Sequence, residues 1–260
     1  MNSSNKPPAT PLPDESAGAQ ASPPESSTHT TQETDATIVE EQESIPALSR
    51  WSSPAIPQST WCASDFMVGV GMVIIQQKTE KIVLLYSSKW KYYFFPRGRK
   101  DVGETLQQAA LREAYEESGY RVDFMPLAIP TRQPHSPETR NRRSHFNTES
   151  IYMTTTNWRA GRSGPTDHGG VYLTSWFVGQ IPEDAVCESG TRMPDEDHFT
   201  THLLSYEEVR NLIWGTEVKL FDYVWAVYQH TKTILQQEES QRAQQLRRFQ
   251  ITKNRPVRRP

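Results

Sequence analysis

A short stretch of the chain combines three clustered carboxylates with an arginine and a fourth carboxylate. Glu113, Glu116 and Glu117 have the i, i+3, i+4 spacing that brings side chains together on one face of an α-helix. Each like-charged pair at such a spacing costs an isolated helix roughly 0.2–0.5 kcal/mol, so we expect something to compensate this charge. Arg112 with Glu104 is one candidate. A hard divalent cation held by carboxylate oxygens, Mg2+ or Mn2+, is the other, and a solvent-exposed charged helix is the alternative to a metal site.

The residues around these carboxylates indicate how they are positioned. Pro96-Arg97-Gly98 is typical of a turn, because proline presets one backbone angle and glycine tolerates the left-handed conformation. Thr105 and Gln108 have the spacing of a capping box, and glycine commonly follows the end of a helix. The pattern therefore predicts a helix of about four turns from near Leu106 to Gly119.

The whole stretch resembles the Nudix box, the signature of Nudix hydrolases. Gly98 is followed after five residues by Glu104, and after seven more by the run Arg112-Glu113-Ala114-Tyr115-Glu116-Glu117-Ser118-Gly119-Tyr120. The resemblance implies Mg2+-dependent hydrolysis of a diphosphate bond on a Nudix-type α/β/α sandwich with a mixed β-sheet. Such hydrolysis needs neutralised phosphate oxygens and an activated water, which clustered Mg2+ and a nearby glutamate can supply.

The resemblance also implies roles for individual residues. The implied metal ligands are Glu113, Glu116 and Glu117, with Mg2+ as the cofactor or Mn2+ in its place. Glu116 is the favoured base. Arg112 and Glu104 would orient the other side chains, and the Gly98 region would offer a backbone carbonyl or shape the turn at the phosphates. The implied catalytic set is Gly98, Glu104, Arg112 and Glu116.

Arginines are the candidates for binding the substrate. The run from Tyr93 to Gly98 resembles the approach to the box in Nudix enzymes that act on dinucleoside polyphosphates, diphosphoinositol polyphosphates or capped RNA. Thr131 to Ser144 is rich in arginine, whose guanidinium fork matches phosphate oxygens in pairs; an ordinary polar insertion is the alternative. The predicted substrate-binding residues are Arg97, Arg99, Arg132, Arg140, Arg142 and Arg143.

A further carboxylate is expected from outside the box, because Nudix enzymes often supply one from a loop. The acidic stretch from Glu183 to Asp197 offers several candidates, and the sequence does not choose among them. They are Glu188, Asp195, Glu196 and Asp197.

Short β-rich runs surround the box and predict the sheet that carries it. The expected strands are Phe66–Ile75, Ile82–Tyr86, Trp90–Phe95, Val122–Ile129, Glu149–Thr156 and Val171–Ile181. An exposed ring in the third of these could stack on a nucleobase, although core packing is the alternative. Ser205 and Glu208 form a second capping box, and a terminal helix from about Glu217 should pack on the sheet.

Composition divides the chain into one domain and two extensions. Residues 1–60 contain eight acidic residues against Lys6 and Arg50, together with nine prolines, and are predicted to form a disordered acidic tail. Residues 61–235 should form the Nudix domain. Residues 236–260 carry a net charge of +5 and are predicted to form a basic Gln/Arg-rich tail. RNA, acidic lipid or an import receptor are partners that such a tail could contact, and a solvated helix end is the alternative.

Two cysteines, Cys62 and Cys187, indicate neither a disulfide framework nor a zinc site. The chain has neither a signal-peptide pattern nor an apolar run of the roughly 20 residues that span a bilayer. A soluble intracellular protein, cytoplasmic or nuclear or both, is therefore expected. The sequence does not decide its oligomeric state.

These observations favour a Mg2+-dependent enzyme that cleaves a diphosphate linkage in an anionic small molecule. A diphosphoinositol polyphosphate or a dinucleoside polyphosphate is the leading substrate class, and mRNA-cap hydrolysis is a second possibility within the family. A non-catalytic Nudix-fold binding protein is the alternative of another kind. The intact box argues against it, because a protein that only binds has no chemical need for all four glutamates and Arg112.

Overall fold

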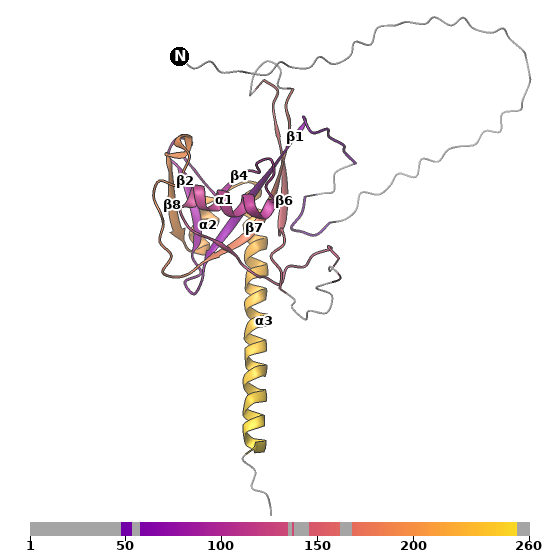
Figure 1. The fold of residues 1–260 in the computed structure, drawn as a ribbon, viewed down its shortest axis with the longest axis vertical. Coiled ribbons are helices and arrows are strands. Elements are labelled where there is room, and N and C mark those ends of the chain that lie inside the picture. The colour runs from indigo at the N-terminus through magenta and orange to yellow at the C-terminus, as the bar shows by residue number, and fades with distance from the viewer. Residues whose placement is uncertain (1–47, 54–57, 135–136, 138–145, 162–167, 254–260) are drawn as a thin grey trace, which may run out of the picture. The chain divides into compact units, whose positions relative to one another are not determined.

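A mixed β-sheet organises the part of the chain that the structure describes (Figure 1). The structure is a computed structural model that describes residues 48–53, 58–134, 137, 146–161 and 168–253, all within the unit Ile45–Pro260. Its strands are β1 (Phe66–Gln76), β2 (Ile82–Ser87), β3 (Tyr92–Phe94), β4 (Arg97–Arg99), β5 (Asp123–Phe124), β6 (Tyr152–Trp158), β7 (Gly170–Ile181) and β8 (Phe199–Leu204).

The strand order places β1 and β7 at the centre of the sheet. The main path runs β3-β2-β1-β7-β5, while β4 pairs with β1, β6 with β7 and β8 with β2. β1 and β7 are parallel from Phe66 opposite Val171 to Gln76 opposite Ile181, and the other pairings are antiparallel. The parallel pair at the centre is buried on both faces, as expected for a sheet covered by helices on both sides.

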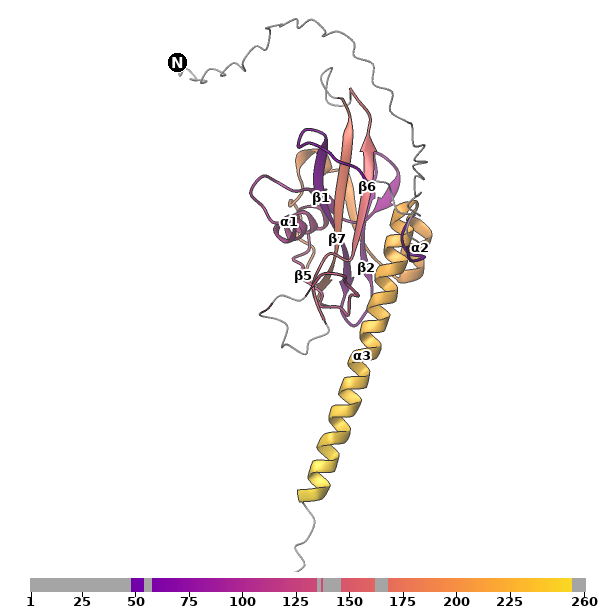
Figure 2. The ribbon, with the colours of Figure 1, turned by 90° about the vertical axis from the view of Figure 1, so that its right-hand side faces the viewer.

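Helices cover both faces of this sheet (Figure 2). They are α1 (Leu106–Ser118) on one face, and α2 (Tyr206–Leu212) and α3 (Thr216–Lys253) on the other. Along β1, Met72 and Ile74 pack in the cluster with the alanines of α1, whereas Val73 and Ile75 pack in the cluster with α3. This alternation is the period-2 pattern of a strand. The predicted α/β/α sandwich with a mixed sheet is therefore confirmed.

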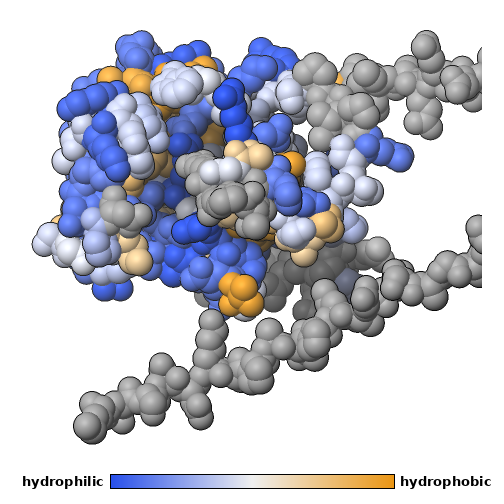
Figure 3. Space-filling model, turned by 90° about the horizontal axis from the view of Figure 1, so that it is seen from above, coloured by the Kyte–Doolittle hydropathy of each residue, from blue (hydrophilic) through white to orange (hydrophobic). Residues whose placement is uncertain are grey.

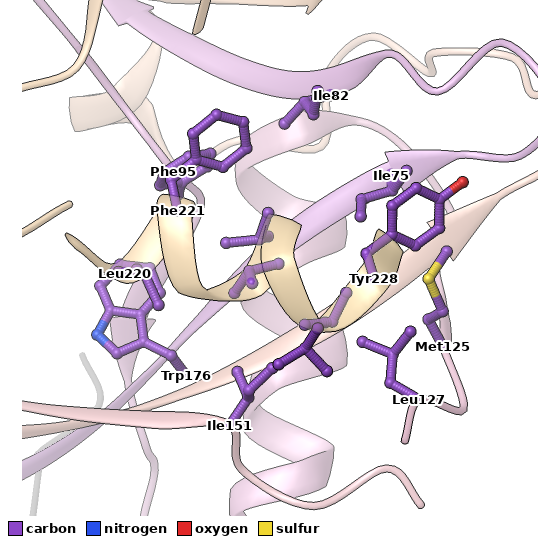
Figure 4. Close-up of a cluster of buried hydrophobic side chains, with 14 of the residues drawn as sticks. Ile75, Ile82, Phe95, Met125, Leu127, Ile151, Trp176, Leu220, Phe221 and Tyr228 are labelled. Carbon is purple, nitrogen blue, oxygen red and sulfur yellow. The ribbon is translucent and has the colours of Figure 1, made fainter. Parts of the chain in front are cut away.

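The larger hydrophobic cluster lies between the sheet and α3 (Figure 4). Leu220 and Phe221 on α3 are fully buried, and the ring of Phe221 lies 5.6 Å from that of Phe95. Val224 and Val227 continue the buried stripe at helical spacing, as the sequence predicted. This cluster anchors the chain segment that leads into the box.

α3 continues well beyond its buried stripe. It extends to Lys253 without interruption, so most of the region predicted as a tail, residues 236–260, is helical, while residues 254–260 lie outside the described structure. This agrees with the alternative of a solvated helix end, since residues 216–253 contain no glycine or proline and many good helix formers. Leu246 and Phe249 on these later turns are exposed.

The N-terminal tail predicted over residues 1–60 lies mostly outside the described residues. Trp51, however, lies ten residues before the expected domain boundary and contacts the domain. Its ring lies 5.6 Å from that of Tyr223, and its carbonyl accepts a 2.5 Å hydrogen bond from the Tyr152 hydroxyl. The sequence did not predict this contact, because Trp51 lies in a polar segment without a pattern of apolar residues.

Three predicted strands are shorter in the structure, and β4 was expected as a turn. The strand expected over Glu149–Thr156 begins only at Tyr152. The strand expected over Val122–Ile129 is reduced to β5, because Pro126 has no N–H to donate to a ladder. The strand expected over Trp90–Phe95 begins only at Tyr92, after Lys91 with its positive φ of 60°.

The surface seen in Figure 3 is largely hydrophilic, with hydrophobic residues in separate small groups. None of the helices in the described ranges is both long and apolar enough to cross a bilayer.

Candidate active site

The ends of α1 are defined by local hydrogen bonds, as the sequence predicted. The Thr105 side chain accepts from the Gln108 N–H at 3.2 Å, and the Thr105 N–H donates to the Gln108 side chain at 2.8 Å. Gly119 takes the left-handed conformation with φ 77° just after the helix. Both signals are short-range, so they fix the angular positions of the box residues before any tertiary contact is considered.

Gly98 lies directly against the Glu113 carboxylate. β4 pairs with β1, which places Gly98 opposite Val70. A Cβ built on Gly98 would lie 2.0 Å from Cδ of Glu113, so only glycine leaves room for this carboxylate. The Gly98 carbonyl accepts a 2.9 Å hydrogen bond from the Tyr172 hydroxyl, a neighbour that the sequence did not predict. The segment around Gly98 and α1 are therefore in direct contact at Gly98 and Glu113.

Arg112 is the centre of a carboxylate network. Its Nε and Nη2 donate to the two oxygens of Glu104 at 2.7 and 2.9 Å, a bidentate pair. Its Nη1 donates to Glu113 at 2.8 Å and to Glu116 at 3.0 Å. The hydrogen bonds between Arg112 and Glu104 lower the pKa of Glu104 to about 2 and raise the pKa of Arg112. One guanidinium therefore orients three carboxylates, and Glu104 is the one that it binds through two parallel hydrogen bonds.

Glu113 and Glu117 are buried on α1, with relative exposures of 9 % and 4 %. Glu117 accepts the Arg97 N–H at 2.7 Å. Burial raises the pKa of Glu117 well above its ordinary value, and the charges of Glu196 and Glu113 add to this effect. Burial also raises the pKa of Glu113, against the opposing contact with Arg112. The two carboxylates form an anionic site that the protein compensates only in part.

The loop before β8 is tied to the C-terminal turn of α1. Thr191 donates to the Glu116 carbonyl at 2.9 Å, and Arg192 donates through Nε to the Glu117 carbonyl at 2.8 Å. These bonds satisfy carbonyls that a helix end leaves without partners. The loop brings Glu196 close enough for its charge to raise the pKa of both buried glutamates. Glu196 is one of the four carboxylates that the sequence left open, and its charge acts on both buried glutamates.

Glu188 makes contacts with residues other than the box carboxylates. It accepts from the Tyr115 hydroxyl at 2.6 Å and pairs with Arg121 at 2.9 Å on the exposed side of α1. These partners lie away from the buried carboxylates, and Glu188 is therefore engaged on the surface.

Three of the six predicted substrate arginines, Arg97, Arg99 and Arg132, lie within the described residues. The Arg97 side chain pairs with Glu217 of α3, a partner that the sequence did not predict, and its guanidinium lies 5.5 Å from the Phe94 ring centroid. Arg99 is exposed, and its carbonyl accepts from Arg112 at 2.9 Å. Arg132 is exposed in the segment after β5. Arg140, Arg142 and Arg143 lie outside the described residues.

An aromatic surface lies beside the loop that carries Glu196. The Trp90 side chain is 53 % exposed, stacks with Tyr92 at a centroid distance of 6.2 Å and meets His198 edge-on at 4.9 Å. His198 Nε2 is buried without a hydrogen-bond partner in the described structure. We call Trp90, Tyr92 and His198 the aromatic platform. Glu196 precedes His198 by two residues.

The donor set fits a hard divalent cation. The box presents carboxylate oxygens, which Mg2+ and Mn2+ prefer, and burial disfavours the charged forms of Glu113 and Glu117, which a bound cation would favour. No three His, Cys, Asp or Glu side chains within the described ranges converge as a ready-made metal site. Nη1 of Arg112 donates to one oxygen of Glu113 and one oxygen of Glu116, so each carboxylate has a second oxygen that can ligate a cation.

The α/β/α sandwich with this box on its helix is the Nudix fold. Residues 65–178 match the family model of the NUDIX domain, and all six implied box residues, from Gly98 to Glu117, fall within this range. This part of the chain is therefore similar to the NUDIX domain.

Solved structures of other proteins are similar to this chain. A C. elegans Ap4A hydrolase in a binary complex is 16% identical, with a TM-score of 0.38 over 62% of this chain and 96% of that one. The E. coli dihydroneopterin triphosphate pyrophosphohydrolase is 16% identical, with a TM-score of 0.41 over 62% and 95%. The MutT protein from Methanosarcina mazei Go1 is 13% identical, with a TM-score of 0.38 over 66% and 99%. The activities in these names are those of the three proteins.

Proposed function

We propose that this protein is a Mg2+-dependent hydrolase of diphosphate linkages. The observation that carries the proposal is the buried pair Glu113 and Glu117, set against Gly98 and flanked by the Arg112–Glu104 pair. Burying carboxylates without full compensation costs stability, so the arrangement is expected where charge is needed for chemistry. The match to the NUDIX domain supports the same reaction class.

The residues divide the chemistry among them. Glu113, Glu116 and Glu117 would hold Mg2+, or Mn2+ in its place, which supplies charge neutralisation of the phosphate oxygens and an acidified water. Arg112 keeps Glu113 and Glu116 oriented, and Glu104 holds Arg112 in turn. Glu116 is the least buried of the three glutamates on α1, which suits the carboxylate that accepts the proton of the attacking water. Glu196 would add a fourth carboxylate to Glu113, Glu116 and Glu117.

The aromatic platform favours a dinucleoside polyphosphate over a diphosphoinositol polyphosphate. A nucleobase offers a flat ring that stacks on an exposed tryptophan, whereas an inositol ring carries no π-face. Lys89 Nζ lies 5.2 Å from the Trp90 ring centroid and places a positive charge beside this surface. An extended substrate could therefore reach from the carboxylates to Trp90 along the loop of Glu196.

A panel of substrates tests this proposal. We would incubate the full chain with Mg2+ and a dinucleoside tetraphosphate, a diphosphoinositol polyphosphate, capped RNA, ADP-ribose or a nucleoside triphosphate, with Glu117→Gln as control. We expect turnover of the dinucleoside tetraphosphate by the wild type and none by Glu117→Gln. Equal rates of the two folded proteins would contradict the assigned chemistry. No turnover with Mg2+ or Mn2+ would favour a non-catalytic binding protein.

A further inference from the structure

A second recess lies on the other side of the sheet, between α2, the first turns of α3 and the segment around residue 50. Its volume is about 530 Å3, within the range of about 300–1,000 Å3 of small-molecule sites. The lining residues are Arg50, Trp51, Tyr206, Arg210, Lys219, Asp222, Trp225 and Ala226. We call it the α2–α3 pocket. None of the box residues contributes to it.

The charge of the α2–α3 pocket is positive. Arg210 donates through Nε to Asp222 at 2.8 Å, so these two side chains neutralise each other. Arg50 and Lys219 remain, both exposed, and neither takes part in an ion pair within the described ranges. Two such cations at one recess attract an anionic group, phosphate above all.

The walls of the α2–α3 pocket are aromatic. Trp225 stacks with Tyr206 at a centroid distance of 4.8 Å and an interplanar angle of 26°. On the other wall, the Arg50 guanidinium lies 4.4 Å from the Trp51 ring centroid. Trp51 is fixed by the Tyr152 hydroxyl, which donates to its carbonyl at 2.5 Å. Flat rings held in place beside cations that have no ion-pair partner within the described ranges suit a ligand that is both flat and anionic.

We propose that the α2–α3 pocket binds a nucleotide unit, a nucleobase together with its phosphate. The base stacks on Trp51 or Trp225, and the phosphate contacts Arg50 and Lys219. Asp222 is placed to accept a hydrogen bond from a ribose hydroxyl or an exocyclic amine of the base. An acidic peptide would satisfy the two cations but would leave the aromatic walls without a partner, which favours the nucleotide.

This site is distinct from the candidate active site. The box lies on α1, on the opposite face of the sheet from α2 and α3 (Figure 2). The nucleotide can come from two sources, a free mononucleotide or a unit of single-stranded RNA, and both present the same base and phosphate. Binding in the α2–α3 pocket needs neither Mg2+ nor turnover. It can therefore be tested independently of the hydrolase activity.

Calorimetric titration of the full chain with AMP tests the proposal. EDTA in the buffer removes divalent cations, so that the carboxylates of the candidate active site repel the phosphate. We expect AMP to bind, and Lys219→Glu and Arg50→Glu each to weaken binding by about tenfold or more, since each removes a charge-assisted contact. Lys78→Glu is the matched control: Lys78 is exposed, lies on the turn between β1 and β2, and should leave the affinity unchanged.

Three further ligands sharpen the result. Adenosine and inorganic phosphate should each bind more weakly than AMP, because each offers only half of the recognised group. A short oligoadenylate that binds much more tightly than AMP supports RNA as the source, and equal affinity supports a free nucleotide. The proposal is overturned if AMP does not bind, if Lys219→Glu binds AMP as the wild type does, or if phosphate or a polyglutamate peptide binds as tightly as AMP.

Discussion

Two buried glutamates on opposite faces of the sheet share one neighbour and differ in how their charge is balanced. Glu217 at the start of α3 pairs with the Arg97 side chain, whereas Glu117 on α1 receives the Arg97 main-chain N–H. None of the ion pairs in the described ranges includes Glu117. Burial raises the pKa of both carboxylates, and Glu196 and Glu113 raise that of Glu117 further.

This difference separates a structural charge from a functional one. The α3 face of the sheet is a hydrophobic core in which a buried glutamate has its own arginine. On the α1 face, Arg112 is shared among the carboxylates of Asp101, Glu104, Glu113 and Glu116. A face that holds more carboxylates than cations is suited to bind a metal ion, while a face that holds matched charges supports the fold.

The largest expected effect is on the α3 face. Phe221 is fully buried against Phe95, so Phe221→Ala should lower the free energy of unfolding by about 3–5 kcal/mol. Phe249→Ala is the matched control on the same helix, where the ring is 68 % exposed, and it should change stability by less than about 0.5 kcal/mol. Urea titration followed by tryptophan fluorescence gives both values. Equal effects of the two variants would mean that the α3 face is not the main core.

Breaking the matched pair should be almost as costly. Glu217→Gln leaves the Arg97 guanidinium without its carboxylate and should destabilise the fold by about 3 kcal/mol, the low end for buried pairs, because 33 % of the Arg97 side chain is exposed. The same urea titration measures it. A change below about 0.5 kcal/mol would show that Glu217 is no more structural than a surface residue.

Gly98→Ala probes the contact between the turn and the helix. The added Cβ collides with the Glu113 carboxylate, and overpacking of this kind costs about 1–3 kcal/mol. The cost should shrink in a Glu113→Ala background, where the colliding carboxylate is gone. Urea titrations of the two single variants and the double variant measure this coupling. Strict additivity would indicate that Gly98 and Glu113 are not in contact.

Trp90→Ala tests the aromatic platform. Loss of one base-stacking surface should weaken binding of a dinucleoside polyphosphate by about 1–3 kcal/mol, seen as a higher KM, without an equal change for a diphosphoinositol polyphosphate. Trp214→Ala is the control, since Trp214 is 69 % exposed and makes no ring contact among the described residues. If both variants leave KM unchanged, the platform does not select the substrate.

Short-range signals carried most of what could be predicted. Thr105 with Gln108 and Gly119 set the ends of α1, and these determine which residues share its face. The alternation along β1 was equally local. Pro126 shows where local patterns fail. The prediction of a strand over Val122–Ile129 rested on β propensity and ignored that proline has no N–H to donate.

Contacts between distant segments could not be predicted. Glu196 is brought to the box by Thr191 and Arg192 hydrogen bonds to helix carbonyls, which depend on the path of a loop. Glu217 reaches Arg97 across 120 residues, and Trp51 reaches Tyr223 across the whole domain. Each of these depends on how elements far apart in the sequence pack together, which no local pattern encodes.

The most direct test of the account is the stability of Glu117→Gln with and without Mg2+. The glutamine keeps an oxygen for the Arg97 N–H and removes a buried charge that is disfavoured at neutral pH, because folding raises the pKa of Glu117. We expect this variant to be at least as stable as the wild type without Mg2+, and Mg2+ to raise the unfolding midpoint of the wild type alone. A variant that is strongly destabilised without Mg2+, and that responds to Mg2+ as the wild type does, would contradict a functional role for this carboxylate.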